Sequence, residues 1–135
     1  MAKVAVNGNT TNPSYASGHV KMRRWISTEE GGYYQYSTTG ATIKGTINAK
    51  SQSFVKISGS NIAVKGDSVS EQDSYSIPSD WSGYDNHSTG VGKVTGGSNF
   101  VFINGTGVAS TGSSVQTHAS TTTTINSGSD FVFIN

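Results

Sequence analysis

An internal repeat constrains the fold of this chain more than any other feature of its sequence. GSNFVFIN at residues 97–104 recurs as GSDFVFIN at residues 128–135, and the two copies differ only where Asn99 is replaced by Asp130. Each copy is a short apolar run rich in β-branched and aromatic residues, which favours a β-strand. An Asn-Gly pair closes the first copy and favours a sharp turn. The repeat therefore predicts a fold assembled from similar supersecondary units.

Two shorter copies occur earlier in the chain. GSNIAVKG at residues 59–66 matches the full repeat with one residue deleted, and VAVNG at residues 4–8 aligns with VFING at residues 101–105. The first copy lacks its opening half and the last copy lacks its closing half. We expect the segments to form a closed ring, in which the C-terminal strand pairs beside the N-terminal strand. The alternative is an open β-solenoid, which would leave the apolar edge at residues 131–134 exposed to aggregation.

The composition predicts a single all-β domain over residues 1–135. Only 13% of the residues are charged, against about 25% in an average globular domain, and glycine, serine and threonine are abundant. No segment shows helical periodicity, and the net charge of +1 is too low to favour disorder. Two stretches fall outside the repeats: residues 20–53 are expected to form an inserted hairpin or arm, and residues 73–86 an inserted loop.

Three histidines occupy comparable places relative to the repeats. His19, His87 and His118 each follow one strand-and-glycine unit, so that in a three-fold ring they would converge on the axis. Three imidazoles predict a zinc site, with iron as the alternative because imidazole also suits Fe(II). The chain has no cysteine, which excludes disulfides and thiolate ligands. The competing interpretation is that each histidine is a solvated loop residue.

The strand motif and the segment after it resemble the PAAR-repeat family, whose members form the sharpened tips of contractile injection machines. GSNFVFING at residues 97–105 matches the Gly-Ser-x-x-Val-x-x-Asn-Gly strand of that family. GVAS at residues 107–110 lies where the family has Pro-Ala-Ala-Arg, and Gly112-Ser113 stands at its Gly-Asp position. The strand motif is the more specific part of this resemblance, because the tetrapeptide is degenerate here.

The resemblance covers residues 1–19 and 55–135 and implies a small conical pseudo-three-fold β-fold. It implies a wide base that docks on the trimeric β-helical spike of a phage tail or type VI secretion-like machine, one copy per trimer. Family members often bind zinc near the apex through three histidines and one cysteine, and the three histidines of this chain match those. Because cysteine is absent, Glu71 or a water molecule is the expected fourth ligand.

The function expected on these grounds is mechanical. The chain would be a metal-rigidified tip that contacts a target membrane transiently, with no catalysis. A β-solenoid adhesin or receptor- and glycan-binding module is the alternative. An enzyme would use the metal to activate water, with Asp80 or Asp85 as the proton acceptor. The start of the chain has no apolar signal segment, so we expect synthesis in the cytoplasm and assembly at the tip of a machine.

Two further motifs suggest other ligands. GVGK at residues 90–93 looks like part of a phosphate loop, but Val94 replaces the required Ser or Thr and His87 takes the place of the first glycine. KMRRW at residues 21–25 is a basic cluster with an aromatic residue, a composition that can bind nucleic acid or anionic lipid. We favour an arm that helps the tip grip its spike, and expect no nucleic-acid partner.

Overall fold

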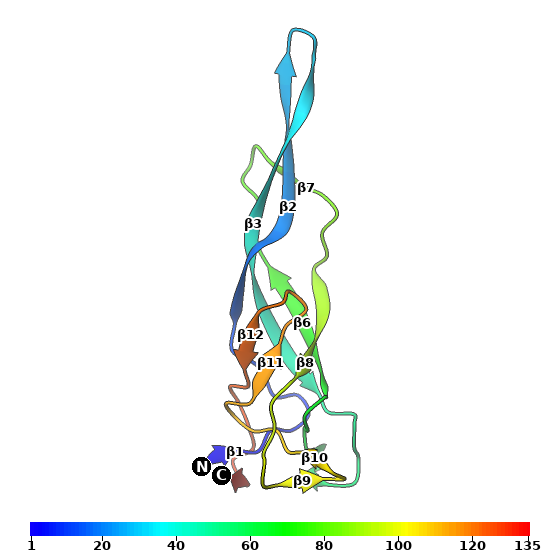
Figure 1. Cartoon of the computed structure of the whole chain (residues 1–135), viewed down its shortest axis with the longest axis vertical. Coiled ribbons are helices and arrows are strands. Elements are labelled where there is room, and N and C mark those ends of the chain that lie inside the picture. Colours follow the sequence, from blue (N-terminus) through cyan, green and yellow to red (C-terminus); the bar gives the residue numbers. More distant parts are fainter.

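The computed structural model describes the whole chain, residues 1–135, as strands and turns without a helix, which confirms the all-β prediction. No helix is therefore present that could cross a membrane. The molecule is elongated, with a base at one end and a long hairpin that reaches far beyond the other elements at the opposite end (Figure 1). The strands are β1 (Ala2–Lys3), β2 (Ser14–Thr28), β3 (Gly31–Asn48), β4 (Lys56–Ile57), β5 (Ser60–Asn61), β6 (Ser68–Ser74), β7 (Ser82–Gly83), β8 (Thr89–Val94), β9 (Phe102–Ile103), β10 (Thr106–Gly107), β11 (Ser114–Gln116), β12 (Thr122–Thr124) and β13 (Phe133–Ile134).

A curled antiparallel sheet forms the body of the molecule. Its seven strands follow the order β12-β11-β8-β6-β3-β2-β7, and the curl makes a half-barrel. Successive side chains of a strand point to opposite faces of a sheet. In β6, Val69 and Glu71 are accordingly buried, whereas Ser70 and Gln72 between and beyond them are exposed. The inner face of the half-barrel thus receives every second residue of β6.

The long hairpin of β2 and β3 contains the stretch expected to be an inserted arm. The two strands pair from Ser14↔Ile43 at the body to Thr28↔Gly31 at the turn. The outer part projects from the body, as expected, but the last part of β3 does not, because Ile43 and Ile47 are buried core residues. The projecting arm is therefore shorter than residues 20–53.

Three two-stranded hairpins form the base, namely β4–β5, β9–β10 and β1–β13. In each of them an isoleucine pairs with a small residue at the matching register: Ile57 with Ser60, Ile103 with Thr106, and Ile134 with Ala2. The third hairpin is built from the two ends of the chain, which lie side by side in Figure 1. The C-terminal strand pairs beside the N-terminal strand, so the closed ring is confirmed over the open solenoid.

A ring of three alanines marks the pseudo-three-fold axis. The amide of Ala5 donates to the carbonyl of Ala109, that of Ala63 to Ala5, and that of Ala109 to Ala63, each over 2.9 Å. All three residues are fully buried. Three backbones meet at this point, and the side chain at each position is a fully buried methyl group. The same ring contributes to the main core cluster, with valines and isoleucines from the sheet around it.

Each alanine strand then leaves the axis through the same turn. The turns share a glycine with positive φ, at Gly8 (89°), Gly66 (98°) and Gly112 (90°). The residue after each glycine accepts a hydrogen bond from the backbone amide three residues earlier, in the pairs Asn9–Val6 (2.7 Å), Asp67–Val64 (2.8 Å) and Ser113–Ser110 (3.0 Å). Three different side chains thus provide one structural function, which is why sequence identity between the copies is low here.

The base pairing corrects two alignments made from the sequence. The amides of Val4, Ile62 and Val108 donate to the carbonyls of three valines in the neighbouring strands, Val132, Val55 and Val101. Residues 4–8 are therefore equivalent to residues 62–66 and 108–112, and aligning them with residues 101–105 was wrong. Residues 59–66 correspond in the same way to residues 105–112, so matching them to the full repeat was also wrong. A short apolar run leads to a glycine turn in both strands, so the sequence pattern matched the wrong strand.

Candidate metal centre

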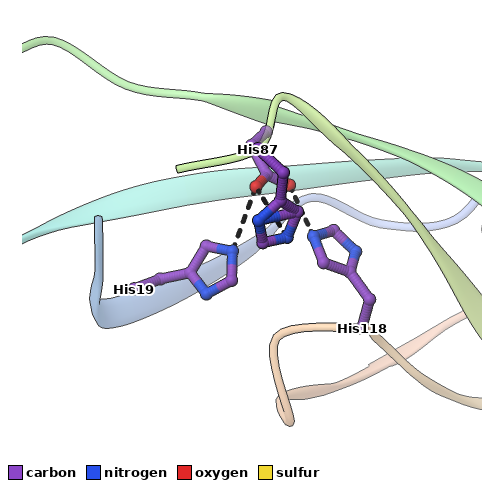
Figure 2. Close-up of side chains that lie close together, drawn as sticks. His19, His87 and His118 are labelled. Atoms are coloured by element: carbon purple, nitrogen blue, oxygen red, sulfur yellow. Dashed lines mark hydrogen bonds and ion pairs between the residues drawn. The ribbon is translucent and has the colours of Figure 1, made fainter. Parts of the chain in front are cut away.

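Three elements of the body bring the predicted histidines together (Figure 2). His19 lies in β2 at a bulge, where the pairing with β3 shifts between Ala16 and Val20, and a bulge changes the direction in which a side chain points. His87 lies just before β8, and His118 just after β11. The centroids of the three rings are 5.0, 5.0 and 5.4 Å apart. The three imidazoles thus form a nearly equilateral triangle.

A carboxylate that the sequence analysis did not select lies among these rings. Asp73 Oδ2 is 3.0 Å from Nε2 of His19 and 3.7 Å from Nε2 of His87, and Asp73 Oδ1 is 2.7 Å from Nε2 of His118. The Asp73 side chain is fully buried, and those of His118 and His19 are 8% and 15% exposed. His87, at 52%, connects the group to solvent.

Two atoms at the centre of this group have no hydrogen-bond partner, His118 Nε2 and Asp73 Oδ1. They lie 2.7 Å apart, but their geometry is not that of a hydrogen bond. Buried polar atoms are nearly always paired, and an unpaired one calls for an explanation such as a bound ion. A cation held between the four side chains would satisfy both atoms.

Glu71, the expected fourth ligand, lies behind His118 instead of facing the other histidines. Its Oε1 accepts a hydrogen bond from the backbone amide of His118 at 2.8 Å and lies 2.7 Å from the ring Nδ1. Asp73 therefore replaces Glu71 as the fourth ligand candidate. Both residues lie on the inner face of β6, two positions apart. The Glu-x-Asp alternation was the available signal. The predicted loop at residues 73–86 is wrong at its start, because Asp73 belongs to β6.

The donor set is three imidazole nitrogens and one carboxylate oxygen, and the four ligand atoms all lie within 4.8 Å of one another. Imidazole and carboxylate suit zinc, and imidazole also suits Fe(II). Four protein ligands are typical of structural zinc sites, whereas catalytic zinc sites keep one position for water. The group of His19, Asp73, His87 and His118 could therefore hold a metal ion.

The charged residues considered for other functions pair with one another on the arm. Asp80 Oδ2 accepts from Arg24 at 2.8 Å, and Asp85 Oδ2 from Lys21 at 3.2 Å. Neither carboxylate belongs to the metal group. Arg23 lies over the ring of Tyr34, with 4.2 Å between the guanidinium carbon and the ring centroid. The basic cluster is thus engaged in contacts within the arm and the neighbouring loop.

A second surface lies at the base, beside the three hairpins. Phe54, Phe100 and Phe131 are 80%, 80% and 77% exposed. Each precedes one of the three equivalent valines, so the three rings occupy equivalent positions about the pseudo-three-fold axis. Exposed apolar patches of this kind mark interaction sites.

Comparison with family models, with curated proteins and with solved structures found no match to this chain. The functional proposal therefore rests on the geometry and chemistry of the site and the base alone.

Proposed function

We propose that the protein is the tip of a contractile injection machine, similar to the PAAR-repeat proteins. The base caps the trimeric β-helical spike of a phage tail or secretion-like machine, a bound metal rigidifies the body, and the opposite end meets the target envelope. Because the arm projects from the end opposite the base (Figure 1), it is assigned to the envelope side here, and the expectation that it grips the spike is withdrawn. The observation that carries this proposal is the base, where one chain presents three exposed phenylalanines in pseudo-three-fold symmetry.

The symmetry of the base supports a trimeric partner. A closed ring of three similar units offers a similar surface to each chain of a trimer, so one copy can satisfy three equivalent contacts. Burying a phenylalanine side chain contributes about 1.5–3 kcal/mol, so covering Phe54, Phe100 and Phe131 would supply a substantial part of the binding free energy. The base hairpins have two strands each and therefore open edges, which the ends of spike strands could cover.

The metal centre supports a mechanical role. The cluster joins β2, β6 and the segments next to β8 and β11, four parts of the chain that are far apart in the sequence. Structural zinc contributes about 10–16 kcal/mol of apparent binding free energy in small domains. We propose zinc as the resident ion, with iron as the alternative, and a role in rigidity without catalysis.

Native mass spectrometry of untagged protein tests the proposed capping. The chain is co-expressed with trimeric spike proteins from the same genome, and the expected species contains one copy of the chain and three of the spike. Phe100→Asp should abolish this species, because it places a charge in the apolar base. Tyr15→Asp, at a 66% exposed site on β2 outside the base, serves as the matched control. Three copies of the chain on each spike trimer, or no complex with any spike, would contradict the proposal.

The alternative function, a glycan- or receptor-binding module, is favoured by one observation on the arm. Trp25, Tyr34 and Tyr36 are 54%, 43% and 58% exposed, with ring centroids 5.1 and 6.2 Å apart along the hairpin. Exposed rings can stack on sugar rings. Glycan-array binding that disappears in Trp25→Ala, together with no binding to any spike, would establish this alternative in place of the tip.

A further inference from the structure

We infer that Glu71 is the positioning residue of the metal centre: it orients His118 as a ligand, and glycines on the neighbouring strand make room for both. The inference rests on the proposed metal site and goes beyond it, because it assigns the buried carboxylate outside the ligand set. It also gives a function to the GVGK motif, which the phosphate-loop interpretation left unexplained.

The contacts of Glu71 fix the His118 side chain in two ways. One oxygen, Oε1, accepts from the backbone amide of His118 at 2.8 Å and is in hydrogen-bond contact with the ring Nδ1 at 2.7 Å. The backbone contact holds the turn after β11, and the ring contact sets the rotation of the imidazole. A carboxylate behind a ligating histidine is a recurrent arrangement in metal sites, where it raises the basicity of the ligand nitrogen.

The same contact determines which ring nitrogen is free to bind. An ionised carboxylate only accepts hydrogen bonds, so Nδ1 carries the proton in the hydrogen bond to Glu71. The unprotonated electron pair is then on Nε2, the atom that lies 2.7 Å from Asp73 Oδ1. Glu71 thus prepares His118 Nε2 as a ligand before any metal arrives.

Two glycines of β8 provide the space for this pair. A Cβ at Gly90 would collide with the imidazole ring of His118, and a Cβ at Gly92 would come within 2.6 Å of Glu71 Oε2. Both glycines face inward, whereas Val91 between them is 68% exposed. The two glycines of GVGK are therefore explained by the clearance that the His118–Glu71 pair needs.

The burial of Glu71 also bears on the charge of the site. Glu71 is 2% exposed, and its Oε2 has no hydrogen-bond partner. Together with Asp73 it places two carboxylates in and behind the ligand set. Two negative charges balance one divalent cation, and a buried charge without a partner is costly. Removing the Glu71 charge should therefore weaken the binding of a divalent ion.

Two variants of Glu71 separate its charge from its hydrogen bonds. Glu71→Gln keeps the size and the acceptor but removes the charge, and Glu71→Met removes both. The measurement is the zinc dissociation constant of metal-stripped, untagged protein, by competition with a chromophoric chelator. We expect about tenfold weaker binding for E71Q and up to about 100-fold for E71M, the range found for outer-shell partners of metal ligands. Val91→Ala, on the outer face of β8, is the control and should bind like the wild type.

A second readout distinguishes positioning from a general loss of structure. In metal-free wild-type protein, ¹⁵N chemical shifts of the His118 ring should report the Nδ1–H tautomer alone. E71Q should retain this tautomer, whereas E71M should give a mixture. If E71M does not fold, E71Q decides by its affinity. Wild-type affinity in E71Q overturns the inference that the charge of Glu71 supports the site.

Variants of the ligand residues test the metal site separately from the role of Glu71. Asp73→Asn and His118→Ala should weaken zinc binding more than E71Q does, because they remove ligand atoms. If both bind zinc like the wild type, or if the wild type binds none, the metal site fails and the inference fails with it. If both lose affinity but neither Glu71 variant does, only the role of Glu71 is overturned.

Discussion

At the scale of single residues, His118 connects the metal group to the rest of the sheet. Its Nε2 faces Asp73, its Nδ1 and amide bond Glu71, and its ring fills the space above Gly90. No other histidine of the cluster has contacts on so many sides. The side chain is accordingly the least exposed of the three, at 8%.

Replacement of His118 by alanine should lower the thermal stability of the metal-loaded protein. With free zinc at about 1,000 times its dissociation constant, binding stabilises the fold by about 4 kcal/mol, which corresponds to about 10–20 °C in Tm at this chain length. We expect most of this difference between wild type and His118→Ala in calorimetry with zinc, and a difference of a few degrees after chelation. Equal losses with and without metal would show that His118 stabilises the fold without a metal.

The one difference between the two long copies of the repeat is explained by closure of the ring. Asp130 Oδ1 accepts from Lys3 Nζ at 2.6 Å, whereas Asn99 in the other copy faces a hairpin with Gly107 at the position equivalent to Lys3. The hydrogen bond and charge of the Lys3 ammonium hold the pKa of the Asp130 carboxyl below its ordinary value of 3.8.

Asp130→Asn should therefore reduce stability only where the carboxylate is charged. A lowered pKa in the folded state stabilises the fold above the unfolded-state pKa, and this contribution disappears as the pH falls through the folded-state value. Because both side chains are exposed, the effect should be small and should weaken in salt. Thermal unfolding at pH 7 should show a slightly lower Tm for the variant, and the two proteins should agree well below pH 3.8. A difference that is independent of pH would exclude the ion pair as the cause.

At the scale of elements, the hairpin of β2 and β3 and the alanine ring are stabilised in different ways. A two-stranded hairpin alone is marginally stable in water. The arm is supported along its length by aromatic contacts, since Arg23 lies over Tyr34 and Tyr84, and Tyr36 packs edge-to-face on Tyr84 at 5.6 Å. The alanine ring instead joins three strands that come from distant parts of the sequence.

A larger side chain in the alanine ring should destabilise the whole base. Ala63→Leu inserts a branched side chain where three backbones meet, and overpacking of this kind typically costs about 1–3 kcal/mol. Urea unfolding should show a lower midpoint with an unchanged slope. Ala2→Leu, at a half-buried position of β1, is the matched control and should change the midpoint little. An unaffected midpoint in Ala63→Leu would mean that the axis is more loosely packed than the hydrogen bonds indicate.

At the scale of the whole molecule, the ring is closed by noncovalent pairing of its two ends. Asn104 and Gly105 form the turn between Ile103 and Thr106 in one base hairpin. In the hairpin of β1 and β13, residues 135 and 1 occupy the corresponding positions between Ile134 and Ala2. The base is therefore three-fold in its pairing, although only two of its hairpins are covalently continuous.

A circular permutant tests this equivalence. Joining Asn135 directly to Met1 and opening the chain between Asn104 and Gly105 should give the same fold, because it moves the break from one turn to its equivalent. We expect a similar circular dichroism spectrum, zinc affinity and Tm. A permutant opened between Val69 and Ser70, inside β6, should be strongly destabilised. Loss of folding in the first permutant would show that the third hairpin is not equivalent to the others.

The sequence by itself determined the strand content, the closure of the ring and the three histidines that meet. These follow from patterns in the residue order: short β-branched and aromatic runs, glycine turns, a repeat split between the two ends, and histidines in matching places after the turns. Such patterns can be recognised by comparing segments of the sequence with one another, without knowing how the segments pack.

Only the tertiary structure decided which strand of each hairpin was equivalent to which, and that Asp73 rather than Glu71 faces the histidines. Both carboxylates share the inner face of β6, so alternation alone cannot separate them. The choice depends on the bulge that redirects His19 and on the pairing of β6 with β3 and β8. That register is fixed by packing between segments far apart in the sequence, and the glycines of β8 acquire their role only when Glu71 and His118 lie against them.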